Sequence, residues 1–335
     1  MPERPVALLA MQPWALPDLF PPDVLNRLRT LARLAPATVL TSFRTVEATA
    51  ALRDVDVLLT GWGCPRIDDA VLAATPRLGA VIHTAGSVKR HVDPVVFARG
   101  IAVSSAAQAN AVPVAEYTVA AVVFGAKRVL SRAHWFAHDR TAGDWRSGAG
   151  TGLYGRTVGV VGASRTGRLV LERLRDFDVR LLLADPYLTA EQARAVGAEL
   201  VDTDALCRRA DLVTLHAPAL PQTRHLLDAR RLGLLRDGTV LINTARGSLV
   251  DTVALTAHCV TGRIEAVLDV TDPEPLPADH PLLHLPNVLV TPHLAGSQGH
   301  ELRRLGEFAV AEVRRLVRGE PLLGAIHGAD LHRIA

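Results

Sequence analysis

Short apolar runs recur along this chain, and polar or charged residues follow each run directly. In the C-terminal half, three such runs are followed in turn by Arg246, Glu274 and His293. Runs of this length, rich in Val, Leu and Ile, are typical of buried parallel strands. In open α/β sheets, ligands bind at the carboxyl ends of the strands. The pattern therefore predicts an α/β fold whose sheet edge carries an anion clamp and an acid.

Composition sets the broad class of the protein. The chain has 335 residues and a net charge of +3, and its arginines are scattered without a basic run or an aromatic platform. We therefore expect no nucleic-acid partner. The three cysteines, Cys64, Cys207 and Cys259, lie far apart, which favours a reducing cytoplasm and argues against disulfides and a metal site. The apolar stretches are strand-sized or interrupted by charge, and the N-terminus lacks a signal-peptide core, so no membrane span is expected.

The strand–helix alternation runs in two blocks. The first block has strands near 6–10, 55–60 and 80–83, and a long apolar helix follows it at 110–132. A Gly-rich connector covers 143–155. The rhythm then restarts, with six strands at 158–161, 180–184, 212–215, 239–242, 265–268 and 288–290. A final helix at 301–319 is expected to run back to the first block. The order predicts two doubly wound parallel-sheet (Rossmann-like) domains, the second inserted into the first.

The turn after the strand at 158–161 reads Gly162-Ala163-Ser164-Arg165-Thr166-Gly167. It matches the dinucleotide-binding fingerprint except at Ser164, which replaces the glycine that lets the backbone approach a pyrophosphate. Serine is small and can donate a hydrogen bond, so a turn with Ser164 is still compatible with pyrophosphate binding. Glycine-rich turns between a strand and a helix also occur for packing reasons, so this hexapeptide alone leaves both interpretations open. Its candidate cofactor contacts are Gly162, Ser164, Arg165, Thr166 and Gly167.

Asp185 ends the next strand, where the fingerprint places an acidic residue that binds the ribose hydroxyls of NAD. The alternative role is a turn or helix-capping aspartate before Pro186, and Pro186 is included among the candidate contacts. A 2′-phosphate beside Asp185 would be repelled by roughly 4 kcal/mol per unit charge pair at surface-like dielectric. Since no arginine follows Asp185 directly, the sequence predicts NAD in preference to NADP.

The order and wording of these segments resemble the D-isomer-specific 2-hydroxyacid dehydrogenase family. The resemblance covers most of the chain, is strongest from about 108 to 297, and is most specific at 243–251, Asn-Thr-Ala-Arg-Gly-Ser-Leu-Val-Asp. It implies a discontinuous substrate-binding domain at 1–107 and 298–335, and an NAD-binding Rossmann domain at 108–297. It also implies a homodimer built through the cofactor domain, with cleft closure over the substrate.

The resemblance adds candidate cofactor contacts in the loops after the later strands. These are His216, Ala217, Pro218, Thr223, Thr244, Ala245, Asp269 and Gly296. Asp269 matches the family residue that holds the nicotinamide carboxamide, and its alternative role is a structural cap at the end of a strand. His216 has a packed or capping role as its alternative, and we do not expect it to be catalytic.

Arg246, Glu274 and His293 match the catalytic positions of the family one for one. Reduction of a 2-oxo acid needs the carboxylate held and the carbonyl polarised, which suits the planar, always charged guanidinium of Arg246. It also needs a proton donor, which suits His293, and a neighbouring Glu274 would stabilise the imidazolium and set its tautomer. Singly, these residues are equally consistent with a surface ion pair, a solvated carboxylate and a helix cap. Together, in family order and spacing, they indicate a catalytic site.

The matching substrate loop begins at Gly86 and is less regular. Val88 stands where family members commonly carry a second glycine, and Arg90-His91 stand in place of an Asp-Asn pair. The backbone amides of Ser87 and Val88 are candidates to hold a carboxylate. Ser87, Lys89 and Arg90 would favour a more anionic substrate, unless Lys89 and Arg90 point to solvent. Trp62, after another strand, either walls the pocket or belongs to the core.

These features predict an NAD-dependent D-2-hydroxyacid dehydrogenase that acts as a 2-oxo acid reductase on glyoxylate-, hydroxypyruvate- or phosphoglycerate-like acids. A formate dehydrogenase is disfavoured, because that branch carries Gln where Glu274 stands. Phosphite or phosphonate oxidation is an alternative, since that branch shares Arg, Glu and His, although its substrate-loop Lys corresponds to Ser87. The other alternative is a non-catalytic NAD(H)-sensing scaffold of the corepressor type.

Overall fold

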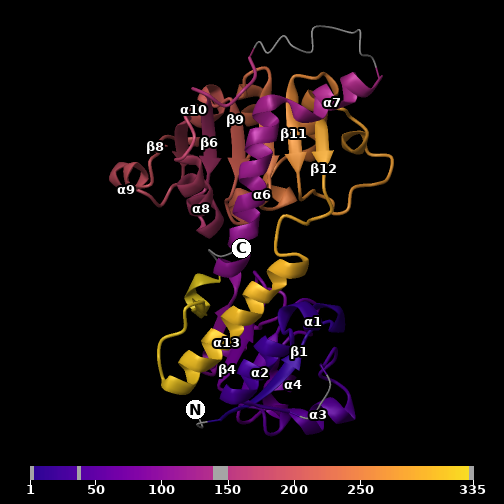
Figure 1. Cartoon of the computed structure of the whole chain (residues 1–335), viewed down its shortest axis with the longest axis vertical. Helices are drawn as coiled ribbons and strands as arrows, with labels where there is room; N and C mark the ends of the chain where they lie inside the picture. The colour runs from indigo at the N-terminus through magenta and orange to yellow at the C-terminus, as the bar shows by residue number, and fades with distance from the viewer. Residues whose placement is uncertain (1–3, 36–38, 139–149, 332–335) are drawn as a thin grey trace. The chain divides into compact units, whose positions relative to one another are not determined.

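The structure is a computed structural model that describes residues 4–35, 39–138 and 150–331. Contacts within the chain divide it into two compact units, residues 1–111 with 297–335 and residues 112–296. We call them the first and the second unit and describe each by itself (Figure 1). The sequence placed these boundaries at 107/108 and 297/298. The assignment of the units to substrate and cofactor stays a prediction.

The sheet of the first unit has the strand order β13-β5-β4-β3-β1-β2. Its strands are β1 (Val6–Ala10), β2 (Arg33–Leu34), β3 (Val57–Thr60), β4 (Ala80–His83), β5 (Ala102–Ser105) and β13 (Ala325–Ile326). All pairs are parallel except β13 with β5, which is antiparallel. The parallel part has the 2-1-3-4-5 order of one doubly wound fold. The predicted fold class is confirmed here, and the antiparallel edge strand is an addition to it.

Helices cover both faces of this sheet. They are α1 (Leu16–Leu19), α2 (Pro22–Leu31), α3 (Val46–Leu52), α4 (Asp69–Ala74), α5 (Pro94–Ala98) and α13 (Leu302–Arg318), with 3-10 turns η1 (Pro13–Ala15), η5 (Gly299–Glu301) and η6 (Gly328–Asp330). Side chains alternate between two cores along each strand, so Leu58 belongs to one and Leu59 to the other. Both faces are therefore apolar, which is why the strands read as continuous hydrophobic runs.

The sheet of the second unit is entirely parallel, with the order β12-β11-β10-β9-β6-β7-β8. Its strands are β6 (Thr157–Val161), β7 (Arg180–Ala184), β8 (Glu199–Leu200), β9 (Leu212–Leu215), β10 (Thr239–Asn243), β11 (Ile264–Leu268) and β12 (Val288–Val290). From β8 inward this is the 3-2-1-4-5-6 order of dinucleotide-binding domains, extended by one strand. Six strands were expected, and β8 was missed because it is two residues long.

The helices of the second unit pack on two faces, each with its own apolar core. They are α7 (Val129–His138), α8 (Arg165–Leu174), α9 (Ala190–Ala195), α10 (Thr203–Arg209), α11 (Ala229–Leu234) and α12 (Thr252–Val260), with 3-10 turns η2 (Pro221–Thr223), η3 (Gly247–Leu249) and η4 (Pro281–Leu283). α6 (Ala107–Lys127) begins in the first unit and continues into the second. Figure 1 shows α6 lying along the sheet beside β9.

The single helix expected at 110–132 is wrong, because the chain breaks it at Arg128. Arg128 has a left-handed φ of 57°, and its guanidinium binds Glu265 at 2.6 Å and the carbonyl of Gly238. α7 therefore starts as a separate helix. Of the predicted connector at 143–155, residues 143–149 lie outside the described residues.

Within the described residues, α6 is long and apolar enough to cross a membrane by length and composition alone. Buried residues make up 44% of its most apolar window, and buried core helices pass the same test, so this is weak evidence for a span.

Candidate functional site

The turn between β6 and α8 requires glycine at its first and last positions. Gly162 has a φ of +95°, and a Cβ built on it would lie 2.7 Å from the backbone nitrogen of Ala217. A Cβ on Gly167 would lie 2.1 Å from the carbonyl oxygen of Gly162. The turn therefore packs directly on the segment after β9, and α8 packs directly on the turn. These are the close approaches that the fingerprint glycines permit.

Ser164, the departure from the fingerprint, caps α8. Its backbone is extended (φ −62°, ψ 178°), and its Oγ accepts a hydrogen bond from the Gly167 N–H at 3.2 Å. Serine is a preferred residue at this position, so the substitution has a local structural reason. Arg165 and Thr166 follow in the first turn of α8, exposed and half-buried respectively. The N-terminus of α8 is therefore placed at the turn, and the contacts of Arg165 and Thr166 with a pyrophosphate stay predictions.

Asp185 ties the end of β7 to the glycine turn. Its Oδ2 accepts from the Ala163 N–H at 2.7 Å, and its Oδ1 accepts from the Tyr187 N–H at 2.9 Å, across the exposed Pro186. Asp185 therefore has the structural role in a turn that the sequence analysis gave as the alternative to cofactor binding. Each carboxylate oxygen has a second lone pair, so these bonds leave capacity for ribose hydroxyls. The ribose contact stays a prediction.

The segment after β9 is shaped by side chains that bond within it. His216 is buried, and its Nε2 lies 3.0 Å from the Thr214 hydroxyl. Burial lowers the pKa of His216 to about 3, so the ring is neutral and unsuited to general acid catalysis. Thr223 donates to the Pro218 carbonyl at 2.6 Å and accepts from the Leu220 N–H at 2.9 Å. The loop is thus held in one shape beside the glycine turn.

Asn243, the last residue of β10, holds the loop that carries Arg246. Its Oδ1 accepts from the Ala245 N–H at 3.1 Å, and its Nδ2 donates to the Arg246 carbonyl at 2.9 Å. Arg246 is half-buried, and its Nη1 donates to the Ala245 carbonyl at 2.6 Å. A Cβ on Gly247 would lie 2.0 Å from the backbone of Thr271. The arginine loop therefore lies directly against the segment that leads to Glu274.

Thr244 is directed toward α6. Its hydroxyl lies 2.9 Å from that of Thr118, whose own proton goes to the Val114 carbonyl at 2.7 Å. Since a hydroxyl has one proton, Thr244 is the donor. This bond fixes the Thr244 side chain, and the predicted cofactor contacts of Thr244 and Ala245 stay predictions.

His293 and Glu274 are in direct contact. Nδ1 of His293 lies 2.6 Å from Oε1 of Glu274, and the two side chains are 48% and 42% exposed. A carboxylate can only accept, so Nδ1 carries the proton and Nε2 is left for a substrate. The backbone of His293 is left-handed (φ 53°), and its N–H donates to the carbonyls of Asp269 and Thr291. The structure therefore brings together two of the three predicted catalytic side chains.

Asp269 organises the loop that carries His293. Its carboxylate is 1% exposed and accepts from the Thr291 hydroxyl at 2.7 Å and from the N–H groups of Leu294 and Ala295 at 2.8 and 3.0 Å. The hydroxyl of Tyr117 on α6 lies 2.9 Å from that of Thr291. The capping role weighed from the sequence is present, and the carboxamide contact stays a prediction. Gly296 follows, half-buried, as the last residue of the second unit.

Sequence reasoning missed Asn243, Tyr117 and Thr291 as positioning residues. Asn243 ends a strand three residues before Arg246, and this position could have identified it as a residue that holds the arginine loop. Tyr117 and Thr291 are 174 residues apart, so no local pattern connects them.

The loop after β4 in the first unit contains the predicted substrate contacts. Val88 is fully buried in the core, so its backbone amide is the group it can offer to a ligand. Ser87 Oγ accepts from the Lys89 N–H at 3.4 Å, and Gly86 is half-buried. Arg90 is exposed, in keeping with the solvent-facing alternative.

Trp62 and the residues after Arg90 have structural partners. The Trp62 ring stacks on Trp14, with centroids 6.0 Å apart, and packs against the apolar core. Nδ1 of His91 lies 2.6 Å from the Cys64 carbonyl, and Asp93 caps α5. Trp62 is thus partly buried against the core, which was one of its two predicted roles. Its contact with substrate stays a prediction.

The three cysteines are buried free thiols. Burial raises the pKa of Cys64 and of Cys259 to about 12, and that of Cys207 to about 11. Since the thiolate is the reactive form, none of the three is poised as a nucleophile.

Comparison with known proteins places these features in a family. Residues 121–295 match the family described as D-isomer specific 2-hydroxyacid dehydrogenase, NAD binding domain. A D-3-phosphoglycerate dehydrogenase of Methanocaldococcus jannaschii is 33% identical over 307 residues, which cover 89% of this chain and 56% of that protein. A glyoxylate reductase of Thermofilum pendens is 34% identical over 277 residues, 80% of each chain.

A solved structure agrees over nearly the whole chain. A crystal structure of a Thermus thermophilus protein, 29% identical, matches with a TM-score of 0.75 over 96% of this chain and 99% of that one. The chain spans little more than half the length of the phosphoglycerate dehydrogenases that it matches.

Proposed function

Because this chain belongs to the D-isomer specific 2-hydroxyacid dehydrogenase family, we propose that it transfers hydride between NAD(H) and a small 2-hydroxy or 2-oxo acid. The family expected from the sequence is confirmed. We propose that the chain works as a 2-oxo acid reductase on glyoxylate-, hydroxypyruvate- or phosphoglycerate-like acids. Two relatives named for phosphoglycerate and glyoxylate support an anionic substrate of this class.

The 2.6 Å contact between His293 and Glu274 carries this proposal. Glu274 sets the tautomer of His293 and stabilises its charged form, so the ring can deliver a proton from Nε2 to the carbonyl oxygen of a 2-oxo acid. Arg246 supplies a planar, permanently charged fork for the carboxylate and the carbonyl. Its loop is held by Asn243 and lies against the segment that leads to Glu274. When bound, NADH supplies the hydride.

The residues present fit a dinucleotide. Gly162 and Gly167 permit the close packing of the turn on the segment after β9 and of α8 on the turn, which is the packing of the dinucleotide-binding fingerprint. The N-terminus of α8 lies at this turn, where a helix N-terminus favours a pyrophosphate. Asp185 stands at the end of β7 beside this turn, where a carboxylate binds ribose hydroxyls and repels a 2′-phosphate. NAD is therefore preferred over NADP. Gly86, Ser87, Val88 and Trp62 remain the candidates for substrate contacts from the first unit.

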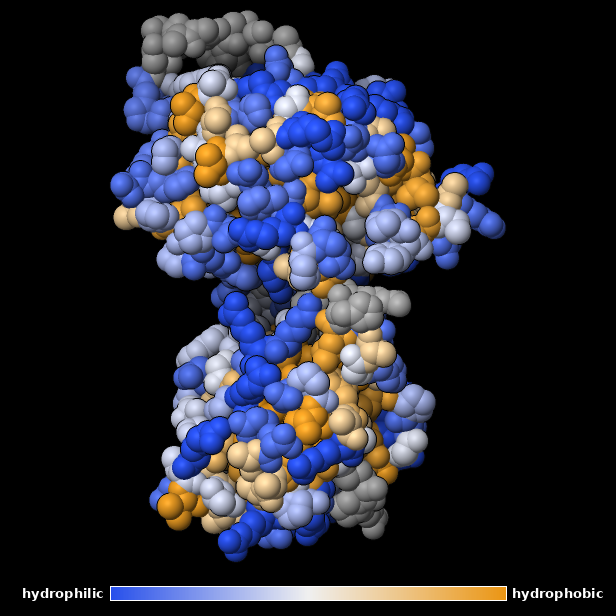
Figure 2. Space-filling view, turned by 180° about the vertical axis from the view of Figure 1, so that it is seen from behind, coloured by the Kyte–Doolittle hydropathy of each residue, from blue (hydrophilic) through white to orange (hydrophobic). Residues whose placement is uncertain are grey.

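We also propose a cytoplasmic homodimer. The dimer is inferred from the family resemblance, and the exposed aromatic side chains of Phe124 on α6 and Trp135 on α7 support a contact on these helices. On the face drawn in Figure 2, apolar residues lie in small patches between hydrophilic ones on both units. Scattered patches of this kind are normal on soluble surfaces and do not themselves mark an interface. Sedimentation velocity of the purified chain tests the dimer.

NADH oxidation with a panel of 2-oxo acids tests the activity. Glyoxylate, hydroxypyruvate, phosphohydroxypyruvate and pyruvate are compared, and phosphite with NAD⁺ tests the alternative oxidation. His293→Ala should abolish turnover while NADH binding, followed by fluorescence, persists. His284→Ala, an exposed histidine of the same unit, is the matched control. Tight NADH binding without turnover on any acid would instead assign the chain to the NAD(H)-sensing scaffolds.

A further inference from the structure

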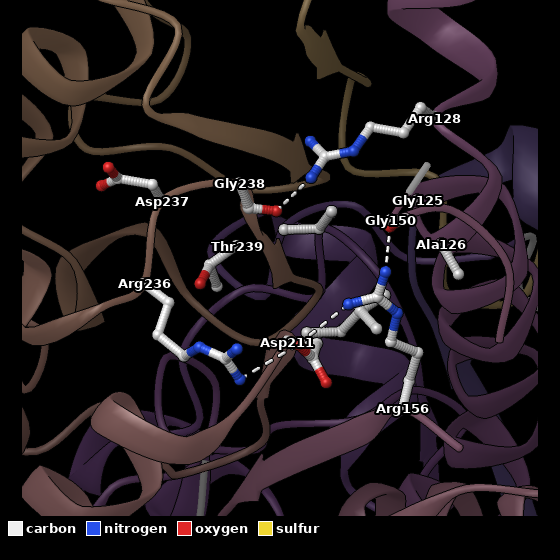
Figure 3. Close-up of a pocket in the computed structure, with 12 residues that line it drawn as sticks. Gly125, Ala126, Arg128, Gly150, Arg156, Asp211, Arg236, Asp237, Gly238 and Thr239 are labelled. Atoms are coloured by element: carbon white, nitrogen blue, oxygen red, sulfur yellow. Dashed lines mark hydrogen bonds and ion pairs between the residues drawn. The ribbon is translucent and has the colours of Figure 1, made fainter. Parts of the chain in front are cut away.

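A cavity of about 220 Å³ lies at the amino edge of the sheet in the second unit (Figure 3). Its lining includes Arg156, Asp211 and Arg236, which precede β6, β9 and β10, and Thr239, the first residue of β10. Arg128, at the break between α6 and α7, completes the set of arginines. The proposed catalytic residues follow the carboxyl ends of these strands, so the cavity is separate from that site.

The cavity has more positive than negative charge. Asp211 Oδ1 accepts from Nη1 of Arg156 at 3.1 Å and from Nη1 of Arg236 at 3.2 Å, so two guanidiniums share one carboxylate. Arg128 is balanced by Glu265 at 2.6 Å. Of the three cationic side chains around the cavity, one is therefore left without a matching anion among the described residues.

The remaining acidic lining residue does not remove this excess. Asp237 is exposed and lies 3.3 Å from Nη1 of Arg263, which balances it. The surplus charge thus belongs to the pair Arg156–Arg236, and Figure 3 shows both guanidiniums turned toward Asp211.

Two side chains at the cavity have donors without an acceptor in the part of the chain that the structure describes. Thr239 is 1% exposed, and its hydroxyl has no hydrogen-bond partner there. Arg236 bonds the Arg209 carbonyl and Asp211 through Nη1, which leaves Nε and Nη2. A buried hydroxyl almost always has a partner, so that of Thr239 is an exception. The Arg236 side chain is 56% exposed, so its remaining donors face solvent and are available to a ligand. An acceptor-rich, negatively charged ligand would accept from the Thr239 hydroxyl and from the remaining donors of Arg236.

We propose that this cavity binds a small oxyanion of the phosphate class. The arginine fork matches the geometry of phosphate oxygens, and the volume is below that of pockets for drug-sized ligands. The site goes beyond the proposed dehydrogenase activity and does not depend on it. Because Arg128 directly follows α6 and Arg236 precedes β10, an anion here links the end of the helix to the sheet edge. Occupation therefore stabilises the folded second unit by mass action.

Calorimetric titration of the whole protein with inorganic phosphate tests the site, with sodium chloride used to match ionic strength. Saturating NADH is included in one arm to fill the glycine turn. Phosphate should bind in both arms, and Arg236→Gln should weaken its binding at least tenfold. Arg230→Gln is the matched control, because Arg230 is 55% exposed against 56% for Arg236 and also shares one carboxylate, Asp204, with a second arginine. The control should bind phosphate like the wild type.

Two further variants keep the outcome decisive. Thr239→Val removes the unpartnered hydroxyl, so the free protein should keep its Tm while phosphate binding weakens severalfold. Arg246→Ala, in the proposed catalytic site, should leave phosphate binding unchanged. Absence of phosphate binding in the wild type would overturn the proposal. So would binding that Arg246→Ala or NADH abolishes and Arg236→Gln does not, and neither result would bear on the dehydrogenase activity.

Discussion

The hydroxyl of Tyr117 donates its hydrogen bond to the hydroxyl of Thr291, over 2.9 Å, and not the reverse. The single proton of Thr291 already goes to the carboxylate of Asp269, which can only accept. Burial raises the pKa of Tyr117, so its hydroxyl keeps its proton at working pH. A chain of hydrogen bonds therefore runs from Tyr117 on α6 through Thr291 to the carboxylate of Asp269, which holds the loop of His293.

Loss of the hydrogen bonds from Tyr117 and Thr291 to Asp269 should slow the chemical step. Thr291→Val removes a donor from a buried carboxylate, which costs about 1–3 kcal/mol, and should lower kcat roughly 10-fold or more. Tyr117→Phe removes only the outer donor and should lower kcat about threefold. Steady-state kinetics with the best 2-oxo acid measures both, with Tyr154→Phe, an exposed tyrosine, as control. A wild-type kcat in Thr291→Val would show that Asp269 holds the loop without this donor.

Glu274→Gln should lower kcat/KM for reduction by roughly 10-fold or more. The amide keeps the size of the side chain but has no charge to stabilise the imidazolium of His293. Steady-state kinetics with the best 2-oxo acid, in both directions, measures the loss. Glu199→Gln, in the same unit, is the control, and a wild-type kcat/KM in Glu274→Gln would exclude a role of the Glu274 charge in supporting His293.

Asp185→Ala should raise the KM for NADH and reduce the preference of the protein for NADH over NADPH. The variant removes the carboxylate that would bind the ribose and repel a 2′-phosphate. It also removes the bond to the Ala163 N–H, so Asp185→Asn, which keeps one acceptor oxygen, separates the two effects. The ratio of kcat/KM for the two cofactors is the measurement. Equal kcat/KM values for NADH and NADPH in the wild type would contradict the assignment of NAD.

Arg246→Lys should cut kcat/KM by a factor on the order of 10 to 100, although the charge is kept. Lysine lacks the planar fork, and a hydrogen bond to a charged group contributes about 1.5–3 kcal/mol. Kinetics on the best substrate measures the loss. Lys127→Arg, the converse exchange on α6, is the control and should leave the rate unchanged. Near-normal reduction by Arg246→Ala would rule out the anion clamp.

Acid should destabilise the folded chain through two buried histidines. Burial lowers the pKa of His83 and of His216 to about 3, with His91 adding to the effect on His83, whereas the unfolded value is 6.5. The unfolded state therefore binds these protons first. The stability they provide is complete above pH 6.5 and is lost as the pH falls toward 3, at up to about 1.4 kcal/mol per histidine per pH unit.

Urea unfolding at pH 7.5 and pH 5.5 measures this loss. His216→Gln retains a hydrogen-bonding side chain that does not titrate, and should lose less stability between the two pH values than the wild type. An equal loss in both proteins would assign the acid sensitivity to other groups.

Local patterns in the sequence predicted most of the strands, but not β2, β5, β8 or β13, and they predicted the residues at the carboxyl ends of the later strands. Runs buried on both faces are visible as apolar letters, and Arg246, Glu274 and His293 follow such runs directly. The two-residue strands β8 and β13 have no such signal, because neighbouring strands define them. The break at Arg128 depends on Glu265 and Gly238, which lie far along the chain.

The supporting contacts of the site could not be predicted for the same reason. Asp185 and Asp269 were recognised as strand-end carboxylates, but their backbone partners depend on the folded loops. The arginines around the cavity come from separate segments, and each one alone looks like a solvated side chain.

Gly247 and the backbone of Thr271 leave no space for even a methyl group between the loops after β10 and β11. An insertion or a bulkier residue in one loop would therefore displace the other loop, and with it the pair Glu274–His293. Under the proposed function, attempts to change the acid that the chain accepts would be blocked here. They have more freedom in the loop after β4, where Arg90 is exposed. A library confined to Lys89 and Arg90 should thus retain far more active clones than one of equal size at residues 246–247.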